Sequence, residues 1–307
     1  MEPHVYVIVP TLNASDIWAK FAQGLTNNIS PGQVLILDSS SNDGTPELAR
    51  SAGFAVQNIE RAQFNHGGTR QYGIELLTDA DIVVFLTQDA VLVDECAINV
   101  LVSAFDSPAV GAAFGRQLAR PEAQPIETHA RLFNYGSRSD LRTVADRDRL
   151  GFKSIFISNS FAAYRKEALL SVGGFPTDVI FGEDTVVAAK LLLSGWSIVY
   201  QAEAKVYHSH SYSVSQELKR YFDIGVLHAR EEWLSDKFGG ASGEGMRFVR
   251  SELRYLWRTC KRLIPSALLR TVVKWVGYRL GRMESRLDVR LKRRLSMHSS
   301  FWRESKG

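Results

Sequence analysis

Short runs of apolar residues, rich in Val and Ile, recur in the first third of the chain at residues 5–9, 34–37 and 82–86. Continuous apolar runs of this length are typical of strands that are buried on both faces. Amphipathic stretches at residues 17–25 and 47–51 lie between them, preceded by the helix-start signals Ser15-Asp16 and Thr45-Pro46. A shorter strand at 54–59 and a helix reaching residue 77 continue the alternation. The pattern predicts an α/β fold in which helices cover both faces of a parallel sheet.

Polar side chains stand where the three predicted strands end. They are Thr11, Asn13, Asp38, Gln88 and Asp89, and Pro10 precedes the first of them. Open α/β sheets bind ligands at the carboxyl ends of their strands, and a carboxylate there suits a hard cation that bridges phosphates. We therefore expect a nucleotide site, with Asp38 at the base or ribose and Asp89 at a metal and the diphosphate. The alternative for Asp89 is a solvated strand-end carboxylate. A site of the NAD type fits poorly, because no G-x-G-x-x-G follows the first strand.

Two further polar clusters lie in the second half of the chain, after a segment at 155–166 that we interpret as a strand entering a helix. Glu183 and Asp184 precede a helical stretch at 186–194, where acids often only complement the helix dipole, by about 0.3–1 kcal/mol. His208 and His210 follow an apolar segment, and in a strand they would project to the same face. A single histidine is more often structural, whereas a neutral imidazole can bind a metal and a protonated one can offset leaving-group charge.

From residue 216 the pattern changes to long helical stretches, interrupted at 239–243 and at Pro265. An apolar stripe recurs at helical spacing at Leu269, Val272, Val273, Val276 and Leu280, and basic residues repeat every four positions at Arg282, Arg286, Arg290 and Arg294. The pattern fits a helix that lies in an anionic membrane interface, anchored by Trp275 and Tyr278. Equally, the stripe could pack on the preceding α/β part of the chain or on another subunit. Nucleic-acid binding is not expected, because no recognition fold accompanies the charge.

Composition sharpens this division of the chain. From residue 250 onward there are 16 Lys and Arg against 4 Asp and Glu, whereas the 249 residues before it hold 21 and 29. A mildly acidic body therefore carries a strongly basic tail. The two cysteines, Cys96 and Cys260, argue against a disulfide framework or a zinc site and suit a reducing cytoplasm. We see no signal-peptide pattern and no apolar run near the ~18 residues of a spanning helix, so we expect a cytoplasmic protein, at most peripheral on the inner face of the cell membrane.

Several of these segments together resemble a known family. Residues 9–13, 37–45 and 87–90 look like the donor-site motifs of inverting family-2 glycosyltransferases with the GT-A fold. Residues 64–70 and 88–90 are most similar to the bacterial rhamnosyltransferase branch, which uses dTDP-L-rhamnose. The similarity spans about residues 5–215, and the order and spacing of the motifs make it specific. The chain departs from the family by having Asp38-Ser39 in place of two acids and Gln88-Asp89-Ala90 in place of Asp-x-Asp, which leaves one carboxylate for the metal.

The resemblance implies a GT-A fold with a mostly parallel central sheet, a catalytic domain at 1–215 and a basic helical region at 216–307. It implies that Asp184 is the base that deprotonates the acceptor, with Glu183 orienting the acceptor. A divalent metal, Mg²⁺ or Mn²⁺, would bind Asp89 and His208, with His210 as the alternative imidazole. The residues implied at the nucleotide sugar are Pro10, Thr11, Asn13, Asp38, Gly67, Gly68, Arg70, Gln88 and Asp89.

The function expected from these features is inverting transfer of L-rhamnose from dTDP-L-rhamnose to a saccharide hydroxyl in O-antigen-like cell-surface polysaccharide. The acceptor would be a saccharide or a lipid-linked glycan at the cytoplasmic face, and the C-terminal helices are compatible with an oligomer. Two alternatives are a family-2 transferase for another sugar nucleotide and an inactive GT-A scaffold with a membrane-binding tail. The acids Asp38, Asp89 and Asp184 speak against the inactive scaffold.

Overall fold

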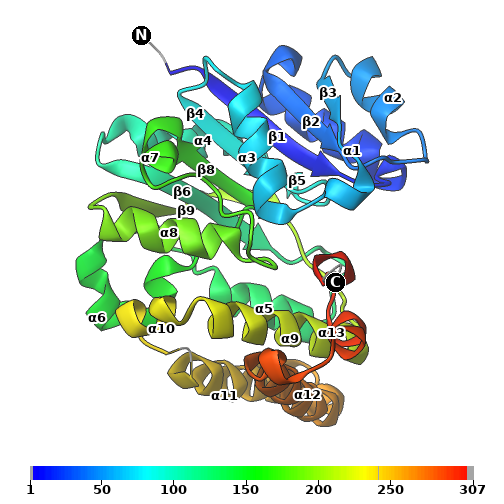
Figure 1. The fold of residues 1–307 in the computed structure, drawn as a ribbon, viewed down its shortest axis with the longest axis vertical. Coiled ribbons are helices and arrows are strands. Elements are labelled where there is room, and N and C mark those ends of the chain that lie inside the picture. The colour runs from blue at the N-terminus through cyan, green and yellow to red at the C-terminus, as the bar shows by residue number, and fades with distance from the viewer. Residues whose placement is uncertain (1–2, 241, 303–307) are drawn as a thin grey trace.

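A computed structural model describes residues 3–240 and 242–302, and its centre is one mixed nine-stranded sheet (Figure 1). The sheet has the order β3-β2-β1-β4-β8-β6-β9-β5, and β7 pairs with β9 beside this path. The strands are β1 (Val5–Thr11), β2 (Val34–Asp38), β3 (Ala55–Asn58), β4 (Ile82–Leu86), β5 (Val91–Leu92), β6 (Val110–Leu118), β7 (Asp140–Arg142), β8 (Phe161–Arg165) and β9 (Ser197–Tyr207).

The first half of the sheet follows the hydrophobic pattern. β1 pairs in parallel with both β2 and β4, and β2 pairs in parallel with β3. The register places Thr11 opposite Asp38, so the polar residues that end two of these strands lie side by side. The predicted parallel arrangement is confirmed in this half.

The second half of the sheet is mixed. β8 runs antiparallel to both β4 and β6, whereas β6 and β9 are parallel to each other. The strand expected within residues 155–166 occupies only Phe161–Arg165, and a 3-10 helix at Gly151–Ile155 and a loop at 156–160 precede it. Ala and Gly make up much of β6, and it contains few β-branched residues. Strands are usually recognised in a sequence by β-branched and aromatic side chains, so this segment gives a weak strand signal.

Helices cover both faces of the sheet (Figure 1). Trp18 and Phe21 pack against Val7 and Val9 on one face, whereas Ile74 and Val187 pack against the opposite face. The helices are α1 (Ser15–Asn28), α2 (Thr45–Ser51), α3 (His66–Leu76), α4 (Ala97–Val102), α5 (Pro125–Asn134), α6 (Arg147–Leu150), α7 (Lys166–Ser171), α8 (Glu183–Leu193), α9 (Val214–Arg230), α10 (Glu232–Phe238), α11 (Ser242–Thr259), α12 (Ile264–Arg282) and α13 (Val289–Leu295).

The start of α1 differs from the predicted self-capped helix. Neither Ser15 nor Asp16 caps it; instead the loop before α2 supplies the acceptors. Asp43 accepts a hydrogen bond from the backbone N–H of Ser15 at 2.9 Å, and Thr45 accepts one from that of Ala14 at 2.8 Å. The two loops at this edge of the sheet therefore hold each other in place.

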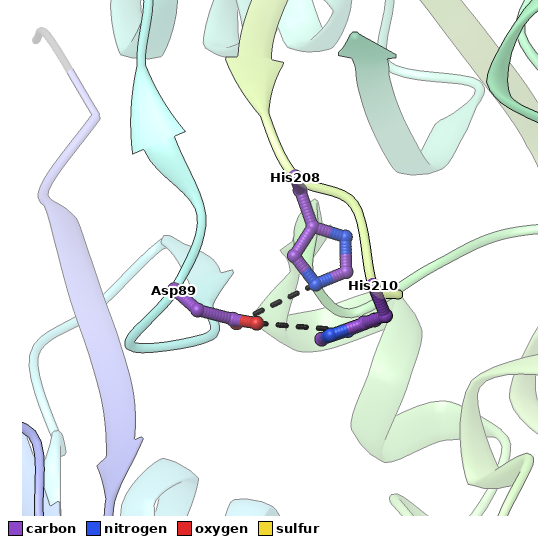
Figure 2. Close-up of side chains that lie close together, drawn as sticks. All are labelled: Asp89, His208 and His210. Carbon is purple, nitrogen blue, oxygen red and sulfur yellow. Dashed lines mark ion pairs between the residues drawn. The ribbon is translucent and has the colours of Figure 1, made fainter. Parts of the chain in front are cut away.

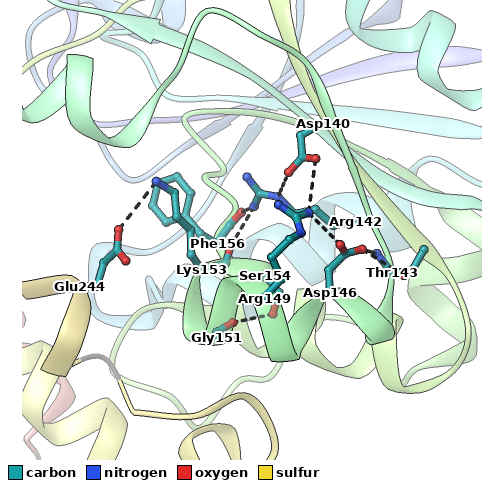
Figure 3. A network of polar contacts seen from close by, with 10 residues as sticks. All are labelled: Asp140, Arg142, Thr143, Asp146, Arg149, Gly151, Lys153, Ser154, Phe156 and Glu244. Carbon is teal, nitrogen blue, oxygen red and sulfur yellow. Dashed lines mark hydrogen bonds and ion pairs between the residues drawn. The ribbon is translucent and has the colours of Figure 1, made fainter. Parts of the chain in front are cut away.

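A polar network fixes the segment that leads into β8 (Figure 3). The buried Arg142 guanidinium donates to the carbonyl oxygens of Lys153 and Phe156, at 3.0 and 2.8 Å. Lys153 also lies 3.8 Å from Glu244 of α11. These contacts anchor the turn that precedes Asn159, a residue of the candidate site.

The helix α12 packs on α9 by an unexpected face. α12 lies along α9, and the closest approach is made by Gly277 and Gly281 of α12 and Gly225 of α9 (Figure 1). The predicted apolar stripe is split by this contact. Leu269 and Val272 are 55% and 57% exposed, whereas Val273, Val276 and Leu280 are partly buried. The stripe is thus neither wholly packed nor wholly free.

The proposed division at residue 215 stays a prediction. Leu227, Leu234 and Phe238, from α9 and α10, belong to the same apolar core as β4 and β6. Ala241 and residues 303–307 of the predicted tail, and residues 1–2 of the predicted domain, lie outside the described residues. Among the helices that are described, none has the length and apolar character needed to cross a membrane.

The α9–α12 contact gives a testable prediction about stability. Gly281→Ala would place a Cβ against the carbonyl oxygen of Phe222, so the two helices must separate. In a helix interior Gly→Ala usually stabilises by about 1 kcal/mol, but overpacking of this kind costs about 1–3 kcal/mol. We expect a lower free energy of unfolding in urea.

The matched control is Gly245→Ala in α11, where an added Cβ meets no described atom within 4 Å. This variant should be as stable as the parent or more stable. If both variants stabilise the protein equally, α12 does not pack on α9 through its glycines.

Candidate active site

A cavity of about 810 Å³ lies beside the carboxyl ends of β4 and β9. Its other walls come from α5, α8, α9, α11 and α12. The cavity therefore lies between the edge of the sheet and the C-terminal helices. Among the residues lining it are Arg70, Asp89, Glu183, Asp184, His208 and His210, six of the residues singled out from the sequence.

Asp89, His208 and His210 form a compact cluster in this cavity (Figure 2). One carboxylate oxygen of Asp89 lies 3.4 Å from Nε2 of His208, and the other lies 3.5 Å from Nε2 of His210. Neither histidine lies in a strand, because β9 ends at Tyr207. The chain leaves the sheet there, and the two rings meet edge to face with their centroids 4.6 Å apart.

The protonation of this cluster suits a cation. Burial alone would raise the pKa of Asp89, but the hydrogen bond and charge of His208 and the charge of His210 outweigh it and lower the pKa. Burial lowers the pKa of His208 and brings that of His210 to about 4. At neutral pH the cluster is therefore one carboxylate with two neutral imidazoles, the forms in which these side chains bind metals.

Asp184 lies in the first turn of α8, which Gly182 starts in a left-handed conformation with φ of 78°. Its carboxylate accepts hydrogen bonds from the backbone N–H groups of Asn159 at 3.2 Å and Thr185 at 2.8 Å. Burial and the neighbouring charge of Glu183 raise the pKa of Asp184 to about 6 despite these bonds. A carboxylate with this pKa can accept a proton near neutral pH.

Glu183 is 4% exposed and lies in a buried ion pair. Its Oε1 is 2.9 Å from Nη1 of Arg70 and 3.0 Å from the side-chain nitrogen of Asn159. Burial alone would raise the pKa of Glu183, but the charge of Arg70 contributes to lowering it. These partners occupy Glu183, so the arrangement favours a positioning role over the predicted contact with the acceptor.

The predicted nucleotide-binding residues at the strand ends bind one another. Asp38 accepts hydrogen bonds from the hydroxyls of Thr11 at 3.0 Å and Ser41 at 2.6 Å. The side-chain amide of Gln88 pairs with both backbone groups of Leu12, at 2.7 and 3.1 Å. This network shapes the loop after β1. Of the strand-end residues predicted at the nucleotide, Asp89 alone is among the described residues that line the cavity.

Pro10 and Asn13 frame the same loop. Pro10 lies within β1 opposite Leu37, and Asn13 has a positive φ of 49° and accepts a hydrogen bond from the backbone of Asn42 at 3.0 Å. The nucleotide contact predicted for them stays a prediction.

Gly67 and Gly68 lie in the first turn of α3, which the side chain of Asn65 caps. A Cβ at Gly67 would overlap the carbonyl oxygen of Pro176, so this glycine permits close packing between α3 and the loop before α8. Helix packing by itself therefore accounts for a glycine at position 67. The donor contacts predicted for Gly67 and Gly68 stay predictions.

Three residues of the site escaped the sequence analysis as candidates. Asn159 contacts both Asp184 and Glu183, Gln117 of β6 contacts His208, and Arg120 donates to the backbone carbonyl of Asp89 at 3.0 Å. The only local signal is the polar triplet at 158–160 inside an apolar segment. Gln117 and Arg120 carry none, because their partners are distant in the chain.

Comparison with known proteins agrees with this arrangement. Residues 6–173 match the profile of glycosyl transferase family 2. The chain is 43% identical over 300 residues to the O-antigen chain rhamnosyltransferase RfbN of Salmonella typhimurium, covering 97% of this chain and 96% of that protein. It is also 43% identical over 304 residues to the O-antigen chain rhamnosyltransferase WbaN of Salmonella anatum, covering 98% and 96%.

Solved structures share the fold at lower identity. The mannosyltransferase PcManGT from Pyrobaculum calidifontis, in complex with GDP-Man and Mn²⁺, aligns with a TM-score of 0.59 at 20% identity, covering 96% of this chain and 85% of that one. Glucosyl-3-phosphoglycerate synthase from Mycobacterium tuberculosis, in complex with Mn²⁺, UDP-glucose and glycerol 3-phosphate, aligns with a TM-score of 0.53 at 18% identity, covering 75% and 80%. The predicted GT-A fold is confirmed. The family profile matches more than half of this chain, and two relatives match it nearly from end to end. This chain therefore belongs to glycosyl transferase family 2.

Proposed function

We propose that this enzyme transfers L-rhamnose from dTDP-L-rhamnose to a saccharide hydroxyl during synthesis of an O-antigen-type polysaccharide. The observation that carries the proposal is that one cavity holds both a carboxylate–imidazole cluster, suited to a metal and a diphosphate, and a buried carboxylate, Asp184, with a pKa of about 6. The choice of rhamnose is supported by the names of the two relatives that match nearly the whole chain.

Asp89, His208 and His210 are the residues that would hold a divalent ion, Mg²⁺ or Mn²⁺. Such an ion would offset the charge of the donor diphosphate and of the leaving nucleoside diphosphate. Two structural neighbours were solved with Mn²⁺ and a nucleotide sugar, which is consistent with this role. Arg131, which also lines the cavity, adds a fixed positive charge on the same side.

Asp184 acts as the general base. The acceptor oxygen attacks the anomeric carbon as the bond from that carbon to the diphosphate oxygen breaks, and the hydroxyl proton passes to Asp184. A single displacement inverts the anomeric configuration. Glu183 contributes indirectly, because its charge helps to raise the pKa of Asp184 while Arg70 and Asn159 hold it in place.

Asp38 serves the donor by holding the loop after β1 through Thr11 and Ser41. Gln88, which follows β4, holds the same loop through two hydrogen bonds to the backbone of Leu12. These bonds would fix the backbone conformation of the loop before the nucleotide binds. A role for Asp38 at the base or ribose remains part of this proposal.

The outer face of the C-terminal helices suits a membrane. Exposed apolar side chains on α11 and α12 are Met246, Trp257, Leu268, Leu269, Val272 and Trp275. Basic residues surround them, and Lys261 lies over the ring of Trp257 at 4.5 Å. Each Lys or Arg near an anionic leaflet contributes about 1 kcal/mol of attraction. We infer peripheral binding at the cytoplasmic face, which would bring the cavity to a lipid-linked acceptor.

The donor assignment predicts a ranking of substrates. With a panel of dTDP-L-rhamnose, UDP-glucose and GDP-mannose, donor turnover should be fastest with dTDP-L-rhamnose. Asp89→Ala should abolish it while the melting temperature stays close to that of the parent, because a strand-end acid contributes little to the core. A different preferred donor would overturn the sugar assignment and leave the reaction class intact.

The base assignment predicts a specific loss. Asp184→Asn should lower turnover by about 10²–10⁴ and leave donor affinity, measured by calorimetry, unchanged. In the parent, turnover should fall as pH drops through about 6, because protonation removes the base. The control Asp178→Asn, at an exposed position before α8, should behave as the parent. Loss of donor affinity in parallel with turnover would make Asp184 a binding residue.

The membrane assignment predicts a separation of activities. The parent should float with vesicles that contain phosphatidylglycerol, and less so at high salt. The double variant Leu269→Glu/Trp275→Glu should lose flotation but keep activity on a soluble acceptor analogue. The control Leu141→Glu changes another leucine that is 55% exposed, on β7, and should float as the parent. If the double variant instead changes the oligomeric state, the face binds a second copy.

A further inference from the structure

Part of the cavity wall is formed by the C-terminal helices α9, α11 and α12, and the reaction described above uses none of its side chains. The charged and aromatic residues of this part are Glu217, Tyr221, Phe248, Glu252, Arg270 and Lys274, which we call the helical wall. The residues proposed for the metal and for the base come instead from the edge of the sheet and from α8. The helical wall is therefore a separate set of groups that faces the same cavity.

Glu252 of α11 is a buried carboxyl without a hydrogen-bond partner. It is 2% exposed, and its Oε1 has no such partner among the residues that the structure describes. The cations of the helical wall pair with Glu217, which lies 3.0 Å from Arg270 and 3.4 Å from Lys274. Burial of a polar group without a hydrogen bond is unfavourable, and nearly all such groups in native proteins have a partner. Because Glu252 lines the cavity, a ligand bound there can supply the partner.

The charges of the helical wall balance one another. Two carboxyl groups, Glu217 and Glu252, stand beside two cations, Arg270 and Lys274. An anionic ligand would meet the unpartnered Glu252, and a cationic ligand would meet Arg270 and Lys274. A sugar hydroxyl both donates and accepts hydrogen bonds, so neighbouring hydroxyls can donate to Glu252 and accept from the ammonium group of Lys274. The charge distribution therefore favours a neutral ligand that is rich in hydroxyl groups.

Two aromatic rings add apolar surface to the helical wall. The Nζ atom of Lys274 lies 5.7 Å from the ring centroid of Tyr221 and 5.5 Å from that of Phe248. Edge contacts with His129 and Phe133, at centroid distances of 5.0 and 5.1 Å, hold the ring of Phe248 in place. Ligand pockets typically combine such apolar surface with a few polar groups. A sugar ring has the matching character, since its C–H groups form an apolar face and its hydroxyls form a polar rim.

The helical wall is joined to the loop that carries His210. Nη1 of Arg270 donates a hydrogen bond to the carbonyl oxygen of Tyr212 at 2.8 Å, and the ring of Tyr212 packs against His210 with the centroids 5.1 Å apart. Asp184 borders the same cavity, whose volume of about 810 Å³ is that of a pocket for a drug-sized ligand. One unit of a saccharide can therefore contact the helical wall while the hydroxyl of another unit reaches Asp184.

We propose that the helical wall is a subsite for the acceptor saccharide. In this subsite Glu252 accepts a hydrogen bond from a sugar hydroxyl, and Tyr221 and Phe248 contact the sugar ring. The inference rests on the proposed function and adds to it the place where a neutral, hydroxyl-rich part of the acceptor binds. Glu252 is a binding residue and takes no proton in the transfer. A carboxyl that lacks a partner until the sugar binds lowers the stability of the free protein in favour of binding.

Saccharide binding to the full chain, without any nucleotide sugar, tests the subsite. The probes are the methyl glycosides of galactose, mannose, glucose and L-rhamnose, with affinities measured by saturation-transfer NMR. At least one probe should bind the parent, and Glu252→Leu should weaken that binding about 10–100-fold, the usual effect of losing a hydrogen bond to a charged group. Glu252→Gln keeps an acceptor oxygen and should lose less. No binding of any probe, or parental affinity in Glu252→Leu, would overturn the proposal.

The melting temperature distinguishes this binding role from a structural one. Glu252→Leu replaces an unpartnered buried carboxyl by an apolar side chain, so the melting temperature should rise while the sugar affinity falls. A lower melting temperature in both Glu252→Leu and Glu252→Gln would make Glu252 a structural residue and would contradict the proposal. The matched control is Glu167→Leu, at an exposed position of α7, which should keep the parental affinity and melting temperature.

The outcome is separate from that of the proposed function, because the binding test contains no donor. Saccharide binding that depends on Glu252, found in a protein that does not transfer rhamnose, would sink only the function. Rhamnose transfer by Glu252→Leu with the parental KM for the acceptor would sink only this inference.

Discussion

The buried ion pair between Arg70 and Glu183 joins the two halves of the chain beside the cavity. Arg70 comes from α3 and Glu183 from α8, and removing one partner of such a pair typically costs about 3–5 kcal/mol because the other charge is left unpaired. The pair also has a chemical consequence. Glu183 stays ionised next to Arg70, and its charge helps to raise the pKa of the adjacent Asp184 to about 6. A structural contact thus raises the pKa of the residue that we propose as the general base.

The candidate metal cluster depends on a second long-range constraint. Asp89 follows β4, whereas His208 and His210 follow β9, and β8 and β6 lie between these two strands in the sheet. The side chains meet because the loops after β4 and β9 approach each other across the ends of β8 and β6. Arg120, just after β6, donates to the carbonyl of Asp89, and its own backbone N–H donates to Ser209 at 3.2 Å. These bonds hold the two ligand-bearing loops at a fixed separation. The site is therefore preorganised by the scaffold rather than by the ligands alone.

The C-terminal helices serve both the cavity and the outer surface. α12 approaches α9 through glycines, which allow the backbones to come close and leave Leu269, Val272 and Trp275 on the outside. On the inner side, Arg270 and Lys274 pair with Glu217 at 3.0 and 3.4 Å and line the cavity. One helix thus lines the cavity on its inner side and presents an apolar, basic face to the surroundings. The acceptor access and the membrane binding that we propose would be linked through this helix.

Local patterns in the sequence determined much of this protein: the apolar runs of β1, β2 and β4, the polar residues at their ends, and the motifs that identify the family. These features depend on neighbours in the chain, and so they are readable from it. Only the tertiary structure decided that β8 runs antiparallel, that Glu183 is held by Arg70, and that Gln117 contacts Nδ1 of His208. It also decided which face of α12 packs, because helical spacing reveals a stripe but not that glycines on another face allow a closer approach. Each of these outcomes depends on partners dozens of residues away in the chain. Which side chains become buried together is decided by the three-dimensional arrangement, and the local pattern does not contain that information.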